Sequence, residues 1–200
     1  MQFVDAVVER PLTYRLMSVR ELVQLLASRS ARRGDFTLAS GRLSSLYIDA
    51  RLTTMSPEGL TVIGPLGLEA LHHTNWRVDS IGGLTLGADP IACAIAYASA
   101  TGHAPLRAFT VRKEPKAHGT RRVIEGPFQA GDRVAVIEDV ITTGGSALKA
   151  VQAVTDAGGT VLGVLALVDR EEGGRETLEA SGLEVIALTR ASDILAQMPS

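Results

Sequence analysis

Cysteine is almost missing from this sequence, which has a single one, Cys93, in 200 residues. One cysteine cannot form an internal disulfide bond or supply a cysteine-based zinc site. Because Cys93 stands among small residues and no histidine stands beside it, we expect a buried and unreactive thiol. The chemistry of the protein must therefore come from other side chains.

An excess of positive charge and a long apolar run are missing as well. The net charge is -2, so neither nucleic acid nor an anionic membrane is an expected partner. The longest stretch without a charged side chain lies between Asp89 and Arg107, and it is too short and too interrupted to span a membrane. Charged residues among the first 20 break any signal-peptide core, so a cytoplasmic protein is predicted.

The composition that remains is ordinary for a globular protein. Hydrophobic residues make up 46% and charged residues 21% of a chain long enough for one domain. Beyond residue 55, apolar strand-like segments alternate with helical ones, which predicts an α/β fold with a mostly parallel sheet flanked by helices. Residues 1–55 do not follow this rhythm. We therefore predict a single domain over residues 1–200, with a small N-terminal hood (1–55) on an α/β core (56–200).

The individual elements follow from apolar spacing and from capping residues. Helices are predicted over residues 18–29, 56–72, 89–102 and 146–157, with a final short helix capped by Ser192. Strands are predicted over residues 36–38, 46–52, 78–82, 107–112, 134–137, 161–168 and 183–188. Residues 113–126 are polar, basic and poor in apolar side chains, which predicts a long mobile loop.

The most specific pattern joins an apolar strand, two acids, a glycine-rich turn and a helix. The strand is 134–137, the acids are Glu138 and Asp139, and the turn runs to Ser146. Ligands of open parallel sheets bind beyond the carboxyl ends of strands, which is where this turn stands. Gly144 and Gly145 let the backbone approach an anion, and the following helix adds unpaired N–H groups. The turn is therefore predicted to bind a phosphate monoester.

The two acids indicate what else the phosphate ligand carries. Carboxylates repel a bare phosphate, but they accept hydrogen bonds from sugar hydroxyls. Glu138 and Asp139 are therefore expected to hold a ribose and to stabilise positive charge that develops on its ring. The alternative is an ordinary capped turn with exposed acids. The pattern is neither a Gly-Lys-Ser/Thr phosphate loop nor a Gly-x-Gly-x-x-Gly dinucleotide fingerprint.

Two further segments are candidates for phosphate handling. Residues 112–122 carry several cations on a segment that leaves a strand, and such a loop can close over a diphosphate and exclude water. Residues 82–90 also connect a strand to a helix, and their glycines permit close approach to phosphate oxygens. The plain alternatives are a solvated basic loop and a tight strand-to-helix connection.

Taken together, these segments resemble the type I phosphoribosyltransferases. Residues 138–146 are similar to the family's phosphoribosyl-diphosphate motif, and the closest resemblance within the family is to the orotate phosphoribosyltransferases. The resemblance covers most of the chain. It is carried by residues 36–42 (Phe-Thr-Leu-Ala-Ser-Gly-Arg), 47–51 (Tyr-Ile-Asp-Ala-Arg), 83–90, 112–119, 138–146 and 168–170 (Val-Asp-Arg).

The resemblance implies a reaction, a cofactor and an assembly. Ribose-5-phosphate would pass from 5-phosphoribosyl 1-diphosphate to orotate, giving orotidine 5′-monophosphate and pyrophosphate in pyrimidine biosynthesis. Mg²⁺ would bridge pyrophosphate and ribose oxygens, with no dedicated protein ligands implied. The partners would be these small molecules and a second copy of the chain, a homodimer in which the 113–126 loop reaches into the neighbouring site.

The resemblance also implies roles for individual residues. The implied phosphoribosyl-diphosphate contacts are Arg112, Lys113, Lys116, His118, Glu138, Asp139, Val140, Ile141, Thr142, Thr143, Gly144, Gly145 and Ser146. Lys116, His118 and Asp139 are the implied catalytic residues. Thr142 and Arg170 are the implied orotate contacts, since a guanidinium can form a fork on the orotate carboxylate. Without the resemblance, Arg170 would be taken as a surface arginine.

One position departs from the family, and three other functions stay open. Ala39 stands where many family members have a lysine that contacts substrate, which leaves the base preference to other residues. The alternatives are transfer to another base, a non-catalytic sensor of phosphoribosyl diphosphate, and a structural α/β subunit. A sensor usually carries an added nucleic-acid-binding segment, which this sequence does not show.

Overall fold

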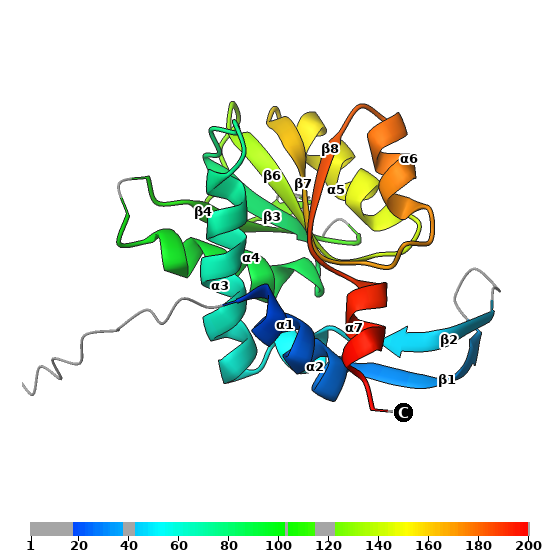
Figure 1. Cartoon of the computed structure of the whole chain (residues 1–200). Helices are drawn as coiled ribbons and strands as arrows, with labels where there is room; N and C mark the ends of the chain where they lie inside the picture. The colour runs from blue at the N-terminus through cyan, green and yellow to red at the C-terminus, as the bar shows by residue number, and fades with distance from the viewer. Residues whose placement is uncertain (1–17, 38–42, 103, 115–122, 200) are drawn as a thin grey trace, which may run out of the picture.

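The centre of the protein is a six-stranded sheet with the strand order β5-β4-β3-β6-β7-β8 (Figure 1). The structure, a computed structural model, describes residues 18–37, 43–102, 104–114 and 123–199. The strands of the sheet are β3 (Ser80–Leu84), β4 (Arg107–Val111), β5 (Ile124–Glu125), β6 (Arg133–Ile141), β7 (Thr160–Asp169) and β8 (Glu184–Arg190). Neighbouring strands pair in parallel, except that β5 is antiparallel to β4. The predicted α/β fold is therefore confirmed.

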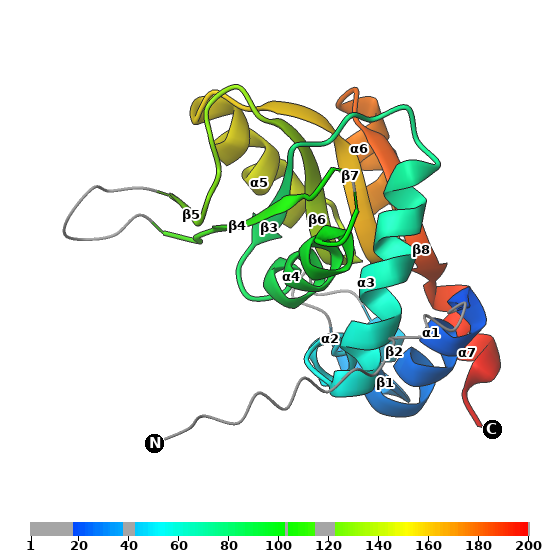
Figure 2. The ribbon, with the colours of Figure 1, turned by 90° about the vertical axis from the view of Figure 1, so that its left-hand side faces the viewer.

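Helices cover both faces of the sheet, as Figures 1 and 2 show. On one face lie α3 (Pro57–His72) and α4 (Ala88–Ser99), and on the other lie α5 (Gly145–Asp156) and α6 (Gly174–Ala180). In β6, Ala135 and Ile137 join the apolar cluster of α3 and α4, whereas Val134 and Val136 join that of α5. Successive strand side chains point to opposite faces, so a strand covered on both sides is apolar throughout.

The hood is built from the first described residues and lies beside the last helix of the chain. It contains α1 (Val19–Leu25), the π-helical turn η1 (Leu26–Ser30), the antiparallel hairpin of β1 (Ala31–Thr37) and β2 (Leu43–Ile48), and α2 (Arg51–Thr54). The C-terminal helix α7 (Ala191–Gln197) lies next to α1 and the hairpin (Figure 1). Ser18 caps α1 by accepting a hydrogen bond from the Glu21 amide at 3.2 Å.

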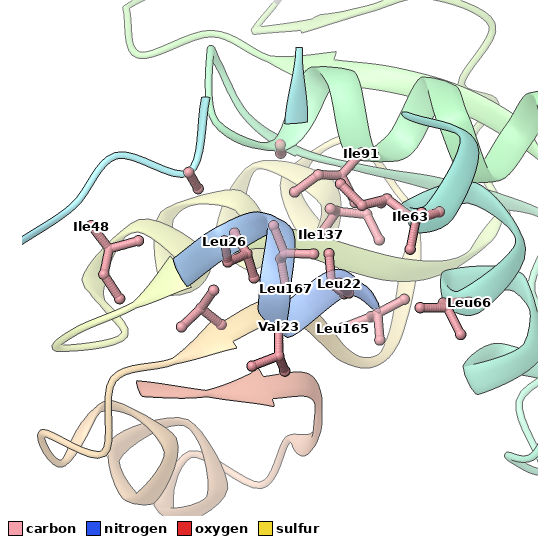
Figure 3. Packing of buried hydrophobic residues seen from close by; sticks show 14 of the residues in the cluster. Leu22, Val23, Leu26, Ile48, Ile63, Leu66, Ile91, Ile137, Leu165 and Leu167 are labelled. Atoms are coloured by element: carbon pink, nitrogen blue, oxygen red, sulfur yellow. The ribbon is translucent and has the colours of Figure 1, made fainter. Parts of the chain in front are cut away.

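The hood and the sheet share one apolar cluster, part of which Figure 3 shows from close by. Leu22 and Leu26 of the hood are fully buried in the same cluster as Ile137, Leu165 and Leu167 of the sheet. Burying a leucine side chain stabilises a fold by about 1.5–3 kcal/mol. This shared packing sets the position of the hood relative to the sheet.

Several element boundaries differ from the predictions. Strand β1 begins at Ala31, five positions before the predicted start, because its pairing with β2 continues that far. The strand predicted over 46–52 ends at Ile48, since residues 51–54 turn into α2. Helix α6 and the short strand β5 were not predicted, and β5 lies within the predicted 113–126 loop. The helix predicted from Ser56 is confirmed, with the Ser56 hydroxyl capping it.

Two local predictions were wrong. Ser192 does not cap the last helix, because that helix already begins at Ala191. The Ser192 amide instead donates a hydrogen bond to Glu171 Oε2 at 2.9 Å. Cys93 is exposed, because Ala92, Ala94 and Ile95 take the inward side of α4. Among the helices described, none is long and apolar enough to cross a membrane.

Candidate active site

One cleft, with a volume of about 320 Å³, lies where the carboxyl ends of β3, β6 and β7 meet the hood. Parallel strands end at the same edge of a sheet, so the segments that follow them converge there. The hood contributes residues 47–51, and the segment after β3 contributes residues 84–87. Of the residues predicted from the sequence, the cleft is lined by Lys113, Glu138, Asp139, Val140, Thr142, Ser146 and Arg170.

The two acids of the cleft lie within strand β6 and not beyond its end as predicted. Pairing with β7 continues through them, with Glu138 opposite Ala166 and Val140 opposite Val168. The side chains of both acids nevertheless line the cleft. Asp139 Oδ1 accepts a hydrogen bond from the Val140 amide at 2.9 Å, which orients that carboxylate.

Glu138 is the more perturbed of the two acids. It is 8% exposed, and its Oε2 atom has no hydrogen-bond partner among the described residues. Burial, and secondly the charge of Asp139, raise the pKa of Glu138 to about 8. At neutral pH the ligand-free protein therefore holds this side chain largely protonated, with an oxygen left for a ligand group.

The glycine-rich turn opens helix α5 without a side-chain cap. Gly144, the N-cap residue, has a φ of +81°, and a Cβ there would lie 2.9 Å from the Gly174 carbonyl oxygen. Only glycine fits this left-handed and crowded position. The first amide groups of α5 thus have no side-chain partner at their cap, which leaves them available to an anion.

The loop after β3 is pressed against the acids. A Cβ on Gly87 would lie 2.4 Å from the Asp139 carboxylate, so a larger residue there would displace that side chain. Asp89 shapes the loop by accepting hydrogen bonds from the Thr85 hydroxyl at 2.7 Å and the Thr110 hydroxyl at 2.8 Å. The second glycine-rich segment, noted in the sequence but not placed among the predicted site residues, therefore forms a wall of the same cleft.

Arg170 is buried and connects the hood to the sheet, unlike an ordinary surface arginine. Its Nη2 atom donates to the Leu46 carbonyl at 2.9 Å and to the Ser44 hydroxyl at 3.0 Å. Its Nε atom donates to Glu172 Oε1 at 2.9 Å. The guanidinium thus already binds one carboxylate at the rim of the cleft.

The remaining predicted residues are not gathered in the cleft. Arg112 lies in an adjoining hollow of about 330 Å³, which shares Thr85 and Lys113 with the cleft. The side chain of Ile141 is 1% exposed in the core, so only its main chain can face a ligand. Thr143, Gly144 and Gly145 shape the turn without lining the cleft. Lys116, His118 and Ala39 lie outside the described residues.

Two features had no place in the predicted site. Residues 47–51 line the cleft, and within them Arg51 forms an ion pair with Asp49. An acid and an arginine two positions apart, directly after a strand, were the available signal. A larger hollow of about 670 Å³ lies between β5 and α5, and it contains none of the predicted residues.

The mostly parallel sheet, the hood, and the acids followed by an uncapped glycine turn define a type I phosphoribosyltransferase. No family model matches the chain. The orotate phosphoribosyltransferase of Aquifex aeolicus is 50% identical over 184 residues, covering 90% of this chain and 100% of the relative. The chain belongs to the orotate phosphoribosyltransferase family.

Solved structures agree with this assignment. The Mycobacterium tuberculosis H37Rv orotate phosphoribosyltransferase in complex with Fe(III) dicitrate has a TM-score of 0.77 and 44% identity, covering 88% of this chain and 98% of that one. The same protein in complex with 5-phospho-alpha-D-ribosyl 1-diphosphate has a TM-score of 0.73 and 41% identity, with coverages of 88% and 98%.

Proposed function

We propose that this protein transfers the ribose-5-phosphate group of 5-phosphoribosyl 1-diphosphate to orotate. The products are orotidine 5′-monophosphate and pyrophosphate, in the biosynthesis of UMP. The observation that carries the proposal is the single cleft in which an uncapped helix start, two acids, a glycine loop and a buried arginine meet. A relative with 41% identity was solved with the sugar diphosphate, which supports the same donor here.

The sugar phosphate is proposed to bind along the end of β6. The turn 142–146 offers main-chain N–H groups and hydroxyls to the 5′-phosphate. Glu138 and Asp139, near the end of β6, then face the ribose hydroxyls as hydrogen-bond acceptors. The order of the acids and the turn along the chain thus matches the order of the ribose hydroxyls and the 5′-phosphate along the ligand.

The chemistry is proposed to be a displacement at C1 of the ribose. The bond from C1 to the diphosphate oxygen breaks, with its electron pair leaving on pyrophosphate. A bond forms from the orotate nitrogen to C1, and the proton of that nitrogen passes to pyrophosphate or to solvent. Positive charge develops on the ribose ring during the exchange, and the Asp139 carboxylate stabilises it. Positioning and charge stabilisation are sufficient, so no nucleophilic side chain is proposed.

Magnesium is the proposed cofactor, and the residues of the cleft fit it. Glu138 has a buried oxygen atom without a partner among the described residues, and the Asp139 carboxylate stands beside it. The described part of the chain contains no group of three or more side chains that could hold a metal ion by themselves. The ion is therefore proposed to be held mainly by substrate oxygens and water. When bound, the ion neutralises charge on the departing diphosphate.

The base is proposed to bind at the other end of the cleft, against Arg170. Its guanidinium is paired with Glu172 at 2.8 Å through Nη2, so the orotate carboxylate is proposed to bind its Nη1 group or to take the place of Glu172. Neutral bases such as adenine or uracil offer no such group. Lys113, together with Lys116 and His118, is proposed to hold the diphosphate end, and Thr142 to contact the base.

The protein is also proposed to act as a homodimer in which each 113–126 loop serves the neighbouring site. Four large apolar side chains are exposed on α2, α3 and α4, which pack side by side (Figure 2). They are Leu52, Met55, Leu60 and Tyr97. Large apolar side chains exposed on neighbouring elements are typical of association surfaces, and we propose that a second copy covers these four. A single domain and a cytoplasmic location also stay predictions.

The decisive experiment is an assay of pyrophosphate release by the full chain with phosphoribosyl diphosphate and Mg²⁺. We expect release with orotate and none with adenine, guanine or uracil. Release with another base would replace orotate in the proposal. Binding of the sugar diphosphate without turnover would indicate a sensor, and no binding at all would indicate a structural subunit.

Asp139→Asn and Lys116→Ala should each lower turnover by roughly 100-fold or more, with little change in the free energy of unfolding.

A further inference from the structure

The cleft contains a cation that the proposed function does not yet use. Arg51, the first residue of α2, forms a fork on Asp49, with Nε to Oδ1 at 2.8 Å and Nη2 to Oδ2 at 3.0 Å. The Arg51 amide also donates to Asp49 Oδ1 at 3.2 Å. All three of these bonds to the carboxylate come from one residue, and the guanidinium is oriented before any ligand arrives.

The backbone around this pair is fixed to the hood. The Asp49 amide donates to the Ser30 carbonyl at 2.9 Å, and the hydroxyls of Ser30 and Thr53 form a buried hydrogen bond at 2.7 Å. Both ends of the short segment are therefore anchored. The arginine side chain is nevertheless 51% exposed, and its fork leaves the Nη1 group for another acceptor.

Arg51 lines the same cleft as residues 84–87 of the loop after β3, Lys113 and Asp139. Gly87 of that loop stands close to the Asp139 carboxylate. Arg170, the other arginine of the cleft, is held by Ser44, Leu46 and Glu172, and its side chain is 6% exposed. Arg51 is thus the more exposed of the two guanidinium groups that line the cleft.

We propose that Arg51, oriented by Asp49, binds the diphosphate end of the sugar substrate from the hood side. This inference rests on the proposed function, in which Lys113 of the same cleft holds the diphosphate end. A planar guanidinium with a free edge suits phosphate oxygens better than sugar hydroxyls. The hood would then hold the leaving group with a positive charge at the moment when it separates from the ribose.

The test compares Arg51→Gln with a matched control, Arg133→Gln. Arg133 forms the same fork on Asp79, with both side-chain bonds at 2.8 Å and a main-chain bond at 2.9 Å, and it lines neither of the two hollows at the site. Calorimetric titration of the full chain with phosphoribosyl diphosphate, pyrophosphate and ribose 5-phosphate measures each end of the ligand separately.

We expect Arg51→Gln to weaken binding of phosphoribosyl diphosphate and pyrophosphate by about 10- to 100-fold. Its affinity for ribose 5-phosphate should stay within about twofold of wild type, and Arg133→Gln should change none of the three affinities. Arg51→Lys and Asp49→Asn keep the positive charge but lose the fork, so their affinities for phosphoribosyl diphosphate and pyrophosphate should lie between those of wild type and Arg51→Gln. These two variants provide the test if Arg51→Gln does not fold.

Two results would overturn the inference while leaving the proposed function intact. One is wild-type affinity for pyrophosphate in the Arg51 variants, and the other is an equal loss of affinity for all three ligands, which would mean that the pair only supports the hood. If wild-type protein binds neither phosphoribosyl diphosphate nor ribose 5-phosphate, the proposed function itself is wrong.

Discussion

The carboxyl group of Glu138 is held where burial and the charge of Asp139 both disfavour its ionised form. Its pKa is raised from 4.5 to about 8, chiefly because burial disfavours the charged form. Between these two pH values the folded protein keeps a proton that the unfolded chain has lost. The contribution of Glu138 to the stability of the ligand-free protein is therefore fullest below pH 4.5, and it is lost as the pH rises through 8.

Replacing this carboxyl group with an amide should remove that pH dependence. We expect the free energy of unfolding of ligand-free Glu138→Gln to exceed that of wild type by about 2–4 kcal/mol at pH 8. The difference should nearly vanish at pH 4.5, where the unfolded wild-type chain also begins to keep its proton. Urea unfolding at both pH values measures it, and an equal difference at the two pH values would contradict the burial argument.

Glu58→Gln supplies the control for this measurement. Hydrogen bonding to Arg29 lowers the pKa of Glu58, an exposed carboxylate, so its contribution to stability has the opposite sign. The amide at position 58 should slightly destabilise the protein at pH 8, since an exposed ion pair contributes little.

Among the elements, the start of helix α5 depends most on one residue. Gly144 combines a φ of +81° with a carbonyl oxygen 2.9 Å from where a Cβ would stand. Gly144→Ala should therefore lower the free energy of unfolding by about 1–3 kcal/mol. It should also weaken ribose 5-phosphate binding, because a shifted turn no longer directs its amides at the phosphate. Urea unfolding and calorimetric titration measure the two effects.

Gly131→Ala separates backbone strain from the loss of the site. Gly131 has a φ of +92°, but a Cβ there would meet nothing within 4 Å, and the residue precedes β6 at the opposite end from the acids. This variant should lose stability and keep its affinity for ribose 5-phosphate. Equal affinity in the two alanine variants would remove the turn from the proposed phosphate site.

For the whole molecule, loop sharing between subunits makes a prediction about mixed dimers. Asp139→Asn and Lys116→Ala should each be nearly inactive alone. If the loop serves the neighbouring subunit, a mixed dimer has one site with both Asp139 and Lys116 intact. Mixing equal amounts of the two variants after unfolding and refolding should then restore about a quarter of wild-type activity. No recovery, with mixed dimers demonstrated by tagged subunits, would indicate that each loop serves its own subunit.

Much of the fold follows from short stretches of sequence. The apolar strand ending in Glu138 and Asp139, the turn at Gly144 and the helix capped by Ser56 are each encoded within about a dozen consecutive residues. The side of α4 that carries Cys93 was predicted wrongly, because a helix of small residues gives little periodic contrast between its faces.

What the sequence determined by itself was the class of the fold, the glycine-rich turn proposed to bind phosphate and the family resemblance, since spacing along the chain is enough to express all three. Only the tertiary structure decided that Arg170 is buried against Leu46, 124 positions away, and that Gly87 meets Asp139. It alone also put the Arg51 fork in the same cleft. The physical reason is that burial, pKa and close approach depend on neighbours in space, and those come from segments whose packing no local pattern specifies.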